Sequence, residues 1–482
     1  MSGKSNAISR GIFKAMGIFG GTQMLTIICS IVRNKLVSVW LGPSGMGLFG
    51  LYNSAIDMIN VFSNMGLRTS SVRDISGAFA SGNENMLARV VLIVRRWSWF
   101  LGAVGAVLTM LLAPLLSNIT FGDTSHAWGY GLLSVSVLLF SVMCCEQAVL
   151  QGTKRLKTLA KASVWGNMIG LLLSVPMYYF LRMDSVLPSI LVYAIANAVS
   201  IWVVRNRDYD GQAGEITVKD TVKGGAEFLK FGFCLTLSLF STLLVSYVFM
   251  AYLNHHSDMA TVGHYQAGYA LVNRYSELFF VAIGMEYYPR LAGVAQSRRR
   301  VDVFVSQETA ITLWLLLPVI IVFMLCRTLV VDLLYAPDFY AMIPYISWCM
   351  VGLVFKGASW CLAYVILAKG ESKVYLATEL SSSALCLVLN ITFFELWGLK
   401  GLGVSYAVWY LSYLLMVGVV YVKKFGITLR RQMLLHVLYA AAMAVAALLA
   451  VESGYYAVAV VLAVVSGAVS IVKIRKSVGK SK

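Results

Sequence analysis

The sequence predicts an all-α polytopic membrane protein with about 14 transmembrane helices. The chain has 482 residues, of which 59% are hydrophobic and only 13% are charged, whereas a soluble protein carries roughly 25% charged residues. Apolar runs of about 20 residues recur from end to end, and each is long enough to span a bilayer. No run alternates as the strands of a membrane β-barrel do.

Fourteen apolar segments are read as spans. They cover residues 12–33, 46–66, 90–115, 130–151, 158–181, 187–204, 229–253, 262–287, 307–335, 344–368, 375–397, 402–422, 432–451 and 454–472. An even number of spans places both termini on the same side of the membrane. The gaps between spans are short, so any chemistry is expected inside the helix bundle or at its mouths.

The basic residues fix the orientation. The net charge is +17, but the charges gather in short clusters at every second gap between spans. This is the positive-inside pattern, which places both termini in the cytoplasm and argues against nucleic acid as a partner. The clusters include Lys154-Arg155-Lys157, Arg205-Arg207, Arg298-Arg299-Arg300, Lys423-Lys424, Arg430-Arg431 and the tail 473–482.

The eight cysteines all lie within predicted spans, and no C-x-x-C motif occurs. We therefore expect neither disulfides nor a metal site, and no bound cofactor. The first apolar run is longer than the core of a signal peptide and no A-x-A site follows it. It is interpreted as a retained first span.

The chain divides into two similar halves. The predicted parts are an N-terminal lobe of six helices (1–206), a cytoplasmic linker (207–228), a C-terminal lobe of six helices (229–424), and an extra helix pair with a basic tail (425–482). Gly47-Leu48-Phe49 resembles Gly263-His264-Tyr265 at an offset of 216, and Gly152 is matched with Gly370 at an offset of 218. Such a near-constant offset favours an internal duplication, and six spans per half makes the repeats parallel.

Polar side chains form stripes on four of these helices. In the second span, Asn53, Asp57, Asn60 and Asn64 fall within one arc at about 100° per residue. The first span carries a similar stripe, which runs from Gln23 to Arg33 and also contains Thr26 and Ser30. Adding 216 to residue numbers 53, 57 and 60 gives Tyr269, Asn273 and Ser276 in the eighth span, which Arg274 and Glu277 flank. Adding 216 to residue numbers 26 and 30 gives Thr242 and Ser246 in the seventh span.

Polar residues facing lipid are costly, so these stripes are expected to line a water-filled cavity. The alternative is a dry bundle in which Asn and Ser bond neighbouring helices. Arg33 has an alternative of its own, because near the outer end of its span it could reach the interface instead. Lys356, in the middle of span 344–368, is interpreted as a structural charge that pairs with Glu379 or Glu146.

Two stretches carry a resemblance to a known family. Residues 32–77 contain Arg33, the pattern Leu41-Gly42-Pro43-x-Gly45-x-Gly47, Gly66-Leu67 and Arg73, and residues 333–344 read LLYAPDFYAMIP. Both resemble bacterial polysaccharide flippases of the Wzx type (O-antigen flippases), in the multidrug/oligosaccharidyl-lipid/polysaccharide (MOP) exporter superfamily. The family usually has Tyr-Gly-Pro-Glu-Phe in the second stretch, so Ala336 and Asp338 depart from its pattern.

The resemblance implies two pseudo-symmetric six-helix lobes in a V shape plus two C-terminal helices, with spans one, two, seven and eight lining a central cavity. It implies transport of an undecaprenyl-pyrophosphate-linked oligosaccharide across the inner membrane, from the inner to the outer leaflet, by alternating access. In related lipid II flippases an extra helix pair makes a lipid groove, and whether this holds here is open. Contact with polysaccharide polymerase machinery is also left open.

These considerations give a set of candidate site residues. Cations suit a pyrophosphate, and amides and hydroxyls suit sugars. The expected substrate-binding residues are Arg33, Arg274, Asn53, Asn60, Asn64, Gln23, Tyr269 and Asn273. Asp57 and Glu277 are the candidates for coupling transport to a proton or sodium gradient. A drug/cation antiporter of the same superfamily is the nearest alternative, and an integral-membrane polymerase or acyltransferase is a more distant one.

Overall fold

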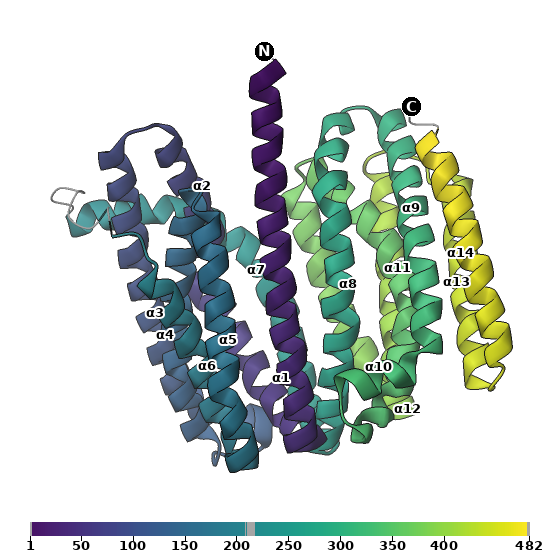
Figure 1. The fold of residues 1–482 in the computed structure, drawn as a ribbon, viewed down its shortest axis with the longest axis horizontal. Coiled ribbons are helices and arrows are strands. Elements are labelled where there is room, and N and C mark those ends of the chain that lie inside the picture. The colour runs from purple at the N-terminus through teal and green to yellow at the C-terminus, as the bar shows by residue number, and fades with distance from the viewer. Residues whose placement is uncertain (1, 208, 210–216, 480–482) are drawn as a thin grey trace. The chain divides into compact units, whose positions relative to one another are not determined.

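The computed structural model describes residues 2–207, 209 and 217–479, without the side chains of residues 2–21, 23, 226–235, 275 and 476–479. Within that part of the chain it contains fourteen α-helices, two short 3-10 helices and no strand. The predicted all-α class is confirmed (Figure 1).

The helices fall into two compact units, residues 1–262 and 263–482. The first unit contains α1 (Ser2–Asn64), α2 (Leu67–Ala80), α3 (Glu84–Phe121), α4 (Ala127–Gly152), α5 (Leu156–Leu181), η1 (Arg182–Ser185), α6 (Val186–Val203) and α7 (Val218–His256). The second contains, apart from the first residues of α8, the helices α8 (Met259–Val294), α9 (Arg298–Leu325), α10 (Arg327–Leu334), η2 (Pro337–Met342), α11 (Ile343–Ala368), α12 (Ser372–Lys423), α13 (Arg431–Glu452) and α14 (Tyr456–Gly479). By contacts, α7 groups with α1, α2 and α3 in the first unit. The predicted start of the second six-helix lobe at 229 stays a prediction.

Thirteen of the fourteen predicted spans each coincide with a helix or with one half of a kinked helix, and the span 307–335 covers parts of two helices, α9 and α10. In the described residues, ten helical segments are long and apolar enough to cross a membrane, and three of these have 41, 48 and 52 residues. About 20 residues suffice for one crossing, so each of the three is long enough for two. Helix α8 is not among the ten; it carries the charges of Arg274, Glu277, Glu286 and Arg290 along its length.

Two helices contain sharp kinks that separate successive spans. In α1 the backbone of Gly42 has a φ of 67° and Pro43 follows it. Glycine adopts this left-handed conformation without strain, and proline offers no N–H to continue the helical ladder. In α12 the kink lies at Trp397 and Gly398.

Three details differ from the sequence prediction. The gap after the second span contains helix α2, whose Leu67, Ile75 and Ala78 are fully buried against α3 and α4. Helix α7 begins at Val218, inside the predicted linker, because Thr217 and Asp220 form a capping box. The hydrogen bonds from Thr217 also lower the pKa of Asp220. The predicted span 307–335 is divided into α9 and α10 at Cys326.

The backbone repeats itself at a spacing of 216 residues. At the end of α4 the N–H groups of residues 153, 154 and 155 donate to the carbonyls of 149, 151 and 150. At the end of α11 those of 369, 370 and 371 donate to the carbonyls of 365, 367 and 366, which is the same pattern. Arg182 (φ 51°, ψ −126°) and Gly398 (φ 58°, ψ −140°) also share an unusual conformation at this spacing. The duplication is therefore visible in the structure, and Gly370 corresponds to Lys154 rather than to Gly152.

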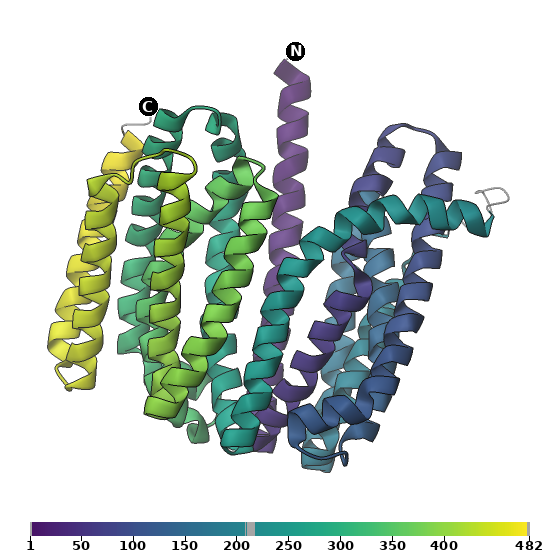
Figure 2. The same ribbon diagram turned by 180° about the vertical axis from the view of Figure 1, so that it is seen from behind.

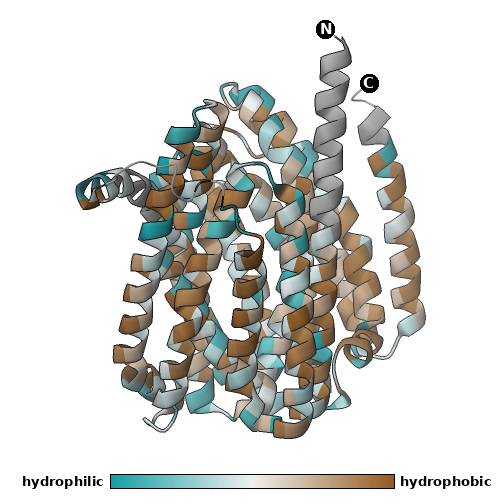
Figure 3. Cartoon of the chain, turned by 60° about the vertical axis from the view of Figure 1, so that its left-hand side comes forward, coloured by the Kyte–Doolittle hydropathy of each residue, from teal (hydrophilic) through white to brown (hydrophobic). Residues whose placement is uncertain are grey.

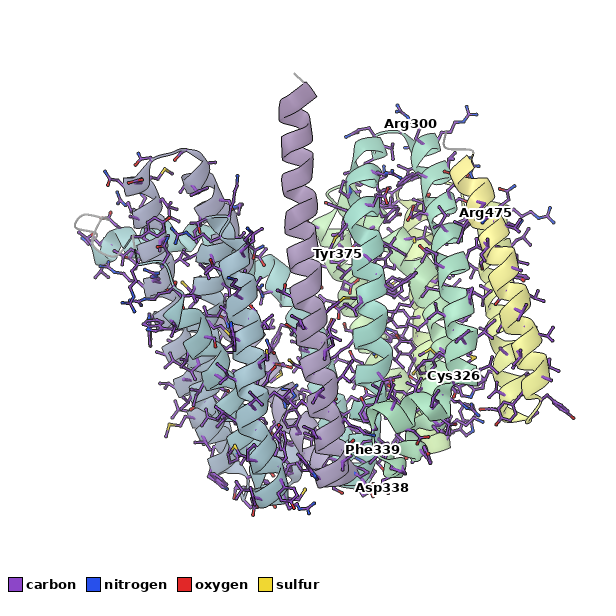
Figure 4. All side chains as sticks on the ribbon, viewed as in Figure 1. Arg300, Cys326, Asp338, Phe339, Tyr375 and Arg475 are labelled. Carbon is purple, nitrogen blue, oxygen red and sulfur yellow. The ribbon has the colours of Figure 1, made fainter. Side chains whose placement is uncertain are left out.

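Two basic residues of the second unit lie at the same end of it. Figure 4 shows Arg300 and Arg475 at one end of this unit and Asp338 and Phe339 at the other. Helices α13 and α14 pack beside α9, as both ribbon views show (Figures 1 and 2). Brown, hydrophobic stretches run along most helices in Figure 3, and many large apolar side chains are exposed on them, as expected for surfaces that face lipid.

Candidate functional site: two caged cations and their polar neighbours

Arg33 lies against two aromatic rings in the first unit. Its guanidinium carbon is 5.2 Å from the ring centre of Phe49 and 4.7 Å from that of Tyr193 on α6. Along a straight helix, residues 33 and 49 would be about 24 Å apart at 1.5 Å per residue. The kink at Gly42 and Pro43 folds the two halves of α1 against each other and so brings Arg33 to Phe49.

The donors of Arg33 are only partly used by the protein. The side chain is half-buried, and its Nε has no hydrogen-bond partner among the described residues. The Tyr193 hydroxyl is oriented by a hydrogen bond that it donates to Oδ1 of Asn167. Aromatic faces attract a cation without neutralising it, so Arg33 keeps both its charge and donor capacity for an anion.

The residues of the polar stripe in the second predicted span differ in how deeply they are buried. Asp57 is exposed and Asn53 is half-buried, whereas Asn60 and Asn64 are only 5% and 7% exposed. Asn53 donates to the carbonyl of Phe49 at 2.7 Å, and Asn64 donates to the carbonyl of Asn60 at 2.8 Å. The Oδ1 atoms of Asn60 and Asn64 have no partner among the described residues. The side chain of Gln23 lies outside the described residues.

Helix α8 carries the candidate residues of the second unit. Tyr269, Asn273 and Glu277 are spaced by four residues and share one face, while Arg274 lies about 100° further round. Tyr269 and Asn273 are half-buried; Arg274 and Glu277 are exposed. Asn273 donates from Nδ2 to the carbonyl of Tyr269 at 3.3 Å.

The same face of α8 meets a cation that the sequence did not assign to a site. Lys356 on α11 donates from Nζ to Oδ1 of Asn273 at 3.0 Å and to the Tyr406 hydroxyl at 3.4 Å. Its Nζ also lies 5.3 Å from the ring centre of Tyr410 and 5.7 Å from that of Phe280. We call these five residues the Lys356 site: Lys356, Asn273, Tyr406, Tyr410 and Phe280.

The pairing expected for Lys356 is wrong. Glu146 instead accepts two hydrogen bonds from Arg95, at 2.7 and 2.9 Å, and is 2% exposed. Glu379 accepts a hydrogen bond from the Tyr413 hydroxyl at 2.6 Å. A charge in the middle of a span was the signal that could have identified Lys356 as a site residue, because such charges are usually functional.

Both cations can bind an anion in surroundings of low polarity. Attraction between charges is stronger there than in water, and guanidinium and ammonium groups are the usual partners of phosphate and carboxylate. The amides and hydroxyls around them can bond the hydroxyl groups of a sugar. This chemistry suits recognition of an anionic, hydroxyl-rich ligand.

The fold has known counterparts among solved structures. An inward-facing multidrug resistance MATE family transporter of the MOP superfamily matches 86% of this chain and 98% of its own, with a TM-score of 0.71 and 14% identity. The lipid II flippase MurJ in an inward closed conformation matches 95% of this chain and 99% of its own, with a TM-score of 0.69 and 12% identity. The fold of this chain is therefore the fold that these two solved structures share.

The sequence comparisons narrow this class. The lipid III flippase of Escherichia coli (strain K12) is 20% identical over 409 residues, which cover 81% of this chain and 94% of that protein. The lipid III flippase of Shigella flexneri matches to the same extent. Residues 36–344 match the family model described as polysaccharide biosynthesis protein. The chain belongs to this family of polysaccharide biosynthesis proteins, and the resemblance noted in its sequence is confirmed.

Proposed function

We propose that this protein is a flippase for an undecaprenyl-pyrophosphate-linked oligosaccharide, such as the repeat unit of O-antigen or of another surface polysaccharide. It would move this lipid from the inner to the outer leaflet of the bacterial inner membrane by alternating access. The observation that carries the proposal is the family membership of the chain, together with its match to 94% of a lipid III flippase. The caged cations support it, because a pyrophosphate is strongly anionic.

Within this proposal, Arg33 binds the pyrophosphate through its planar fork of donors. Arg274, exposed on α8 in the second unit, is proposed as a further substrate-binding residue. Asn53, Asn60, Asn64 and Tyr269 are proposed to bond sugar hydroxyls. The unpaired Oδ1 atoms of Asn60 and Asn64 favour such a role, because buried polar atoms normally have a partner.

We also propose that both termini are cytoplasmic. The placement of Arg300 and Arg475 at one end of the second unit supports this orientation under the positive-inside rule (Figure 4). A proton or sodium gradient is the proposed energy source, with Asp57 and Glu277 as its acceptors. Contact with polysaccharide polymerase machinery is a further part of the proposal.

A drug/cation antiporter is the second candidate, because the solved structures with this fold include multidrug transporters. An antiporter for cations favours an acidic binding site, whereas Arg33 and Lys356 each place a positive charge among aromatic rings. An integral-membrane polymerase or acyltransferase is less favoured, because the matching relatives and solved structures are described as flippases or transporters.

The test uses the full chain in proteoliposomes with a fluorescent undecaprenyl-pyrophosphate oligosaccharide. A membrane-impermeant quencher measures how fast the lipid crosses between leaflets. We expect crossing that depends on the protein, together with no accumulation of ethidium in parallel vesicles. Ethidium transport without lipid crossing would favour the antiporter and contradict the proposal.

A further inference from the structure

We propose that Lys356 is a second anion-binding centre, located within the second unit, that takes a single oxyanion of the transported molecule. The inference rests on the proposed function, because it assumes that this molecule is a lipid-linked glycan. The oxyanion has two sources in such a molecule, namely the carboxylate of an acidic sugar and the pyrophosphate. Both offer the same chemistry to an ammonium group.

The first step is that hydrogen bonds fix the position of the Lys356 ammonium group, whereas no counter-charge in direct contact neutralises it. Among the residues that the structure describes, no carboxylate forms an ion pair with Lys356. Its oxygen partners are the amide of Asn273 and the hydroxyl of Tyr406, both uncharged. Glu277 acts on Lys356 only at longer range and is itself exposed.

The contrast with Arg95 shows that this chain can neutralise a structural cation in its helices. Arg95 forms a bidentate ion pair with Glu146 and also donates to the backbone carbonyl of Asn206 at 2.9 Å. A buried charge is costly unless a counter-charge accompanies it. The uncompensated charge of Lys356 is therefore expected to be balanced by a ligand.

The second step is the number of donors that remain. An ammonium group has three N–H donors, and two of them have oxygen partners in the Lys356 site. Within the part of the chain that the structure describes, the third donor has no partner and is left for a ligand oxygen, while the rings of Tyr410 and Phe280 stabilise the charge. One donor suits one oxygen, unlike the fork of Arg33, which suits two.

The third step concerns access. Lys356 is half-buried, and so are Asn273 and Tyr410, whereas Phe280 and Tyr406 are 4% and 5% exposed. The site therefore combines partly exposed polar and aromatic groups with two buried aromatic rings. An anion that enters can reach the ammonium without displacing the hydrogen bonds that hold it.

Asn273 then becomes a positioning residue rather than a direct sugar contact. Its Oδ1 accepts hydrogen bonds from Lys356 and from the Tyr406 hydroxyl, at 3.0 and 3.1 Å, and its Nδ2 donates to the carbonyl of Tyr269. Both ends of the amide are thus occupied. Its role is to direct the Lys356 ammonium.

The experiment measures binding of two probes, sodium glucuronate and sodium pyrophosphate, to the full chain in nanodiscs, with glucose as the neutral control. Binding is followed as protection of Lys356 against a small acylating reagent, quantified by mass spectrometry, and by calorimetry. We expect one or both anions to protect Lys356 and glucose not to. The anion that protects identifies the source of the oxyanion.

Variants separate charge from packing. Lys356→Met should lower the affinity of the protecting anion by about ten-fold or more, the usual loss for a charge-assisted contact. Asn273→Asp should do the same, because the new carboxylate would neutralise Lys356 as Glu146 neutralises Arg95. Asn273→Gln, which keeps an uncharged amide, should restore part of the affinity.

The matched control is Lys369→Met. Lys369 also donates to a carbonyl, that of Ala295 at 3.0 Å, and lies 5.2 Å from the ring centre of Phe425, but it is outside the Lys356 site. Its replacement should leave anion affinity unchanged. Equal anion affinity in wild type and Lys356→Met, or no protection by either anion, would overturn the inference.

The outcome is separable from that of the proposed function. If wild-type protein transports the lipid-linked oligosaccharide and Lys356→Met transports it at the same rate, the flippase proposal stands and the role of Lys356 is wrong. If Lys356 binds an anion but the protein moves no lipid-linked glycan, the flippase proposal fails and the anion site remains.

Discussion

The two units share the backbone of a duplication, but they do not share charges. The helix ends after Gly152 and Ala368 have the same hydrogen bonds at a spacing of 216 residues, as do the conformations of Arg182 and Gly398. At this spacing, however, Arg33 corresponds to Phe249 and Lys356 to Phe140. Each unit therefore places its caged cation at a position where the other has phenylalanine.

This difference shows which parts of the molecule the duplication preserved. Turn geometry depends on a few backbone positions and is kept in both units, because a change there would misdirect whole helices. The cations have diverged in kind and in place: a guanidinium on α1 in the first unit and an ammonium on α11 in the second. We infer that the two units have cation sites of different chemistry.

The strongest test of this comparison replaces Arg95, which is paired with a carboxylate, and Lys356, which is held by uncharged groups. Arg95→Met leaves Glu146 buried without its partner, and breaking a buried pair typically costs about 3–5 kcal/mol. Lys356→Met removes a cation that forms no ion pair with a carboxylate among the described residues, so it should be neutral or stabilising. Thermal unfolding of the purified variants in detergent measures both effects.

The double variant Arg95→Met/Glu146→Leu is the control for this prediction. Replacing both partners by apolar side chains should recover most of the stability that the single change loses. A loss of stability in Lys356→Met as large as that in Arg95→Met would mean that Lys356 is structural, as first expected from the sequence.

Arg33 provides the next test, with a smaller effect. Arg33→Ala removes a charge-assisted contact and should weaken substrate binding by about 1.5–3 kcal/mol, or roughly ten- to hundred-fold. Arg33→Lys keeps the charge but loses the planar fork, so partial activity is expected. Lipid crossing in proteoliposomes, at equal amounts of reconstituted protein, measures the loss.

Tyr193→Leu is the matched variant for the cage. It removes one of the two rings beneath Arg33 and keeps the guanidinium, so its effect should be smaller than that of Arg33→Ala. Full transport by Arg33→Ala would show that the arginine only anchors α1 at the membrane interface and would remove the first cation from the comparison.

The sequence predicted the helices far better than the contacts of their side chains. Apolar runs and glycine-proline signals at residues 42 and 43 located the spans, because a bilayer imposes their length and composition. The start of α7 was missed although Thr217 and Asp220 carry the capping signature. The partner of Lys356 could not be obtained from spacing, because Asn273 and Tyr406 come from helices that are distant in sequence.

The burial of the polar residues in the second span could not be predicted from the sequence either. Helical periodicity places Asn53, Asp57, Asn60 and Asn64 on one arc, but it does not indicate how deep each lies along the helix. In the structure the two later residues are covered, and only Asp57 of the four is exposed. Neighbouring helices decide burial, and their packing depends on contacts throughout the unit.

The smallest effects are expected from the acidic residues, which also differ between the units. At the spacing of 216, Asp57 corresponds to Asn273 and Glu277 to Val61, so neither carboxylate is repeated. Both are exposed and lie in helices that contribute to the candidate sites.

If they carry protons during transport, Asp57→Asn and Glu277→Gln should keep lipid binding but flatten the dependence of transport on pH. Because Glu277 also attracts Lys356 at longer range, Glu277→Gln should bind the anionic probes slightly more tightly, whereas Asp57→Asn should not. Transport measured between pH 5.5 and 8.5 in proteoliposomes, with and without a sodium gradient, distinguishes the two ions. An unchanged pH profile in both variants would assign these carboxylates a static role, and coupling would then have to come from other residues.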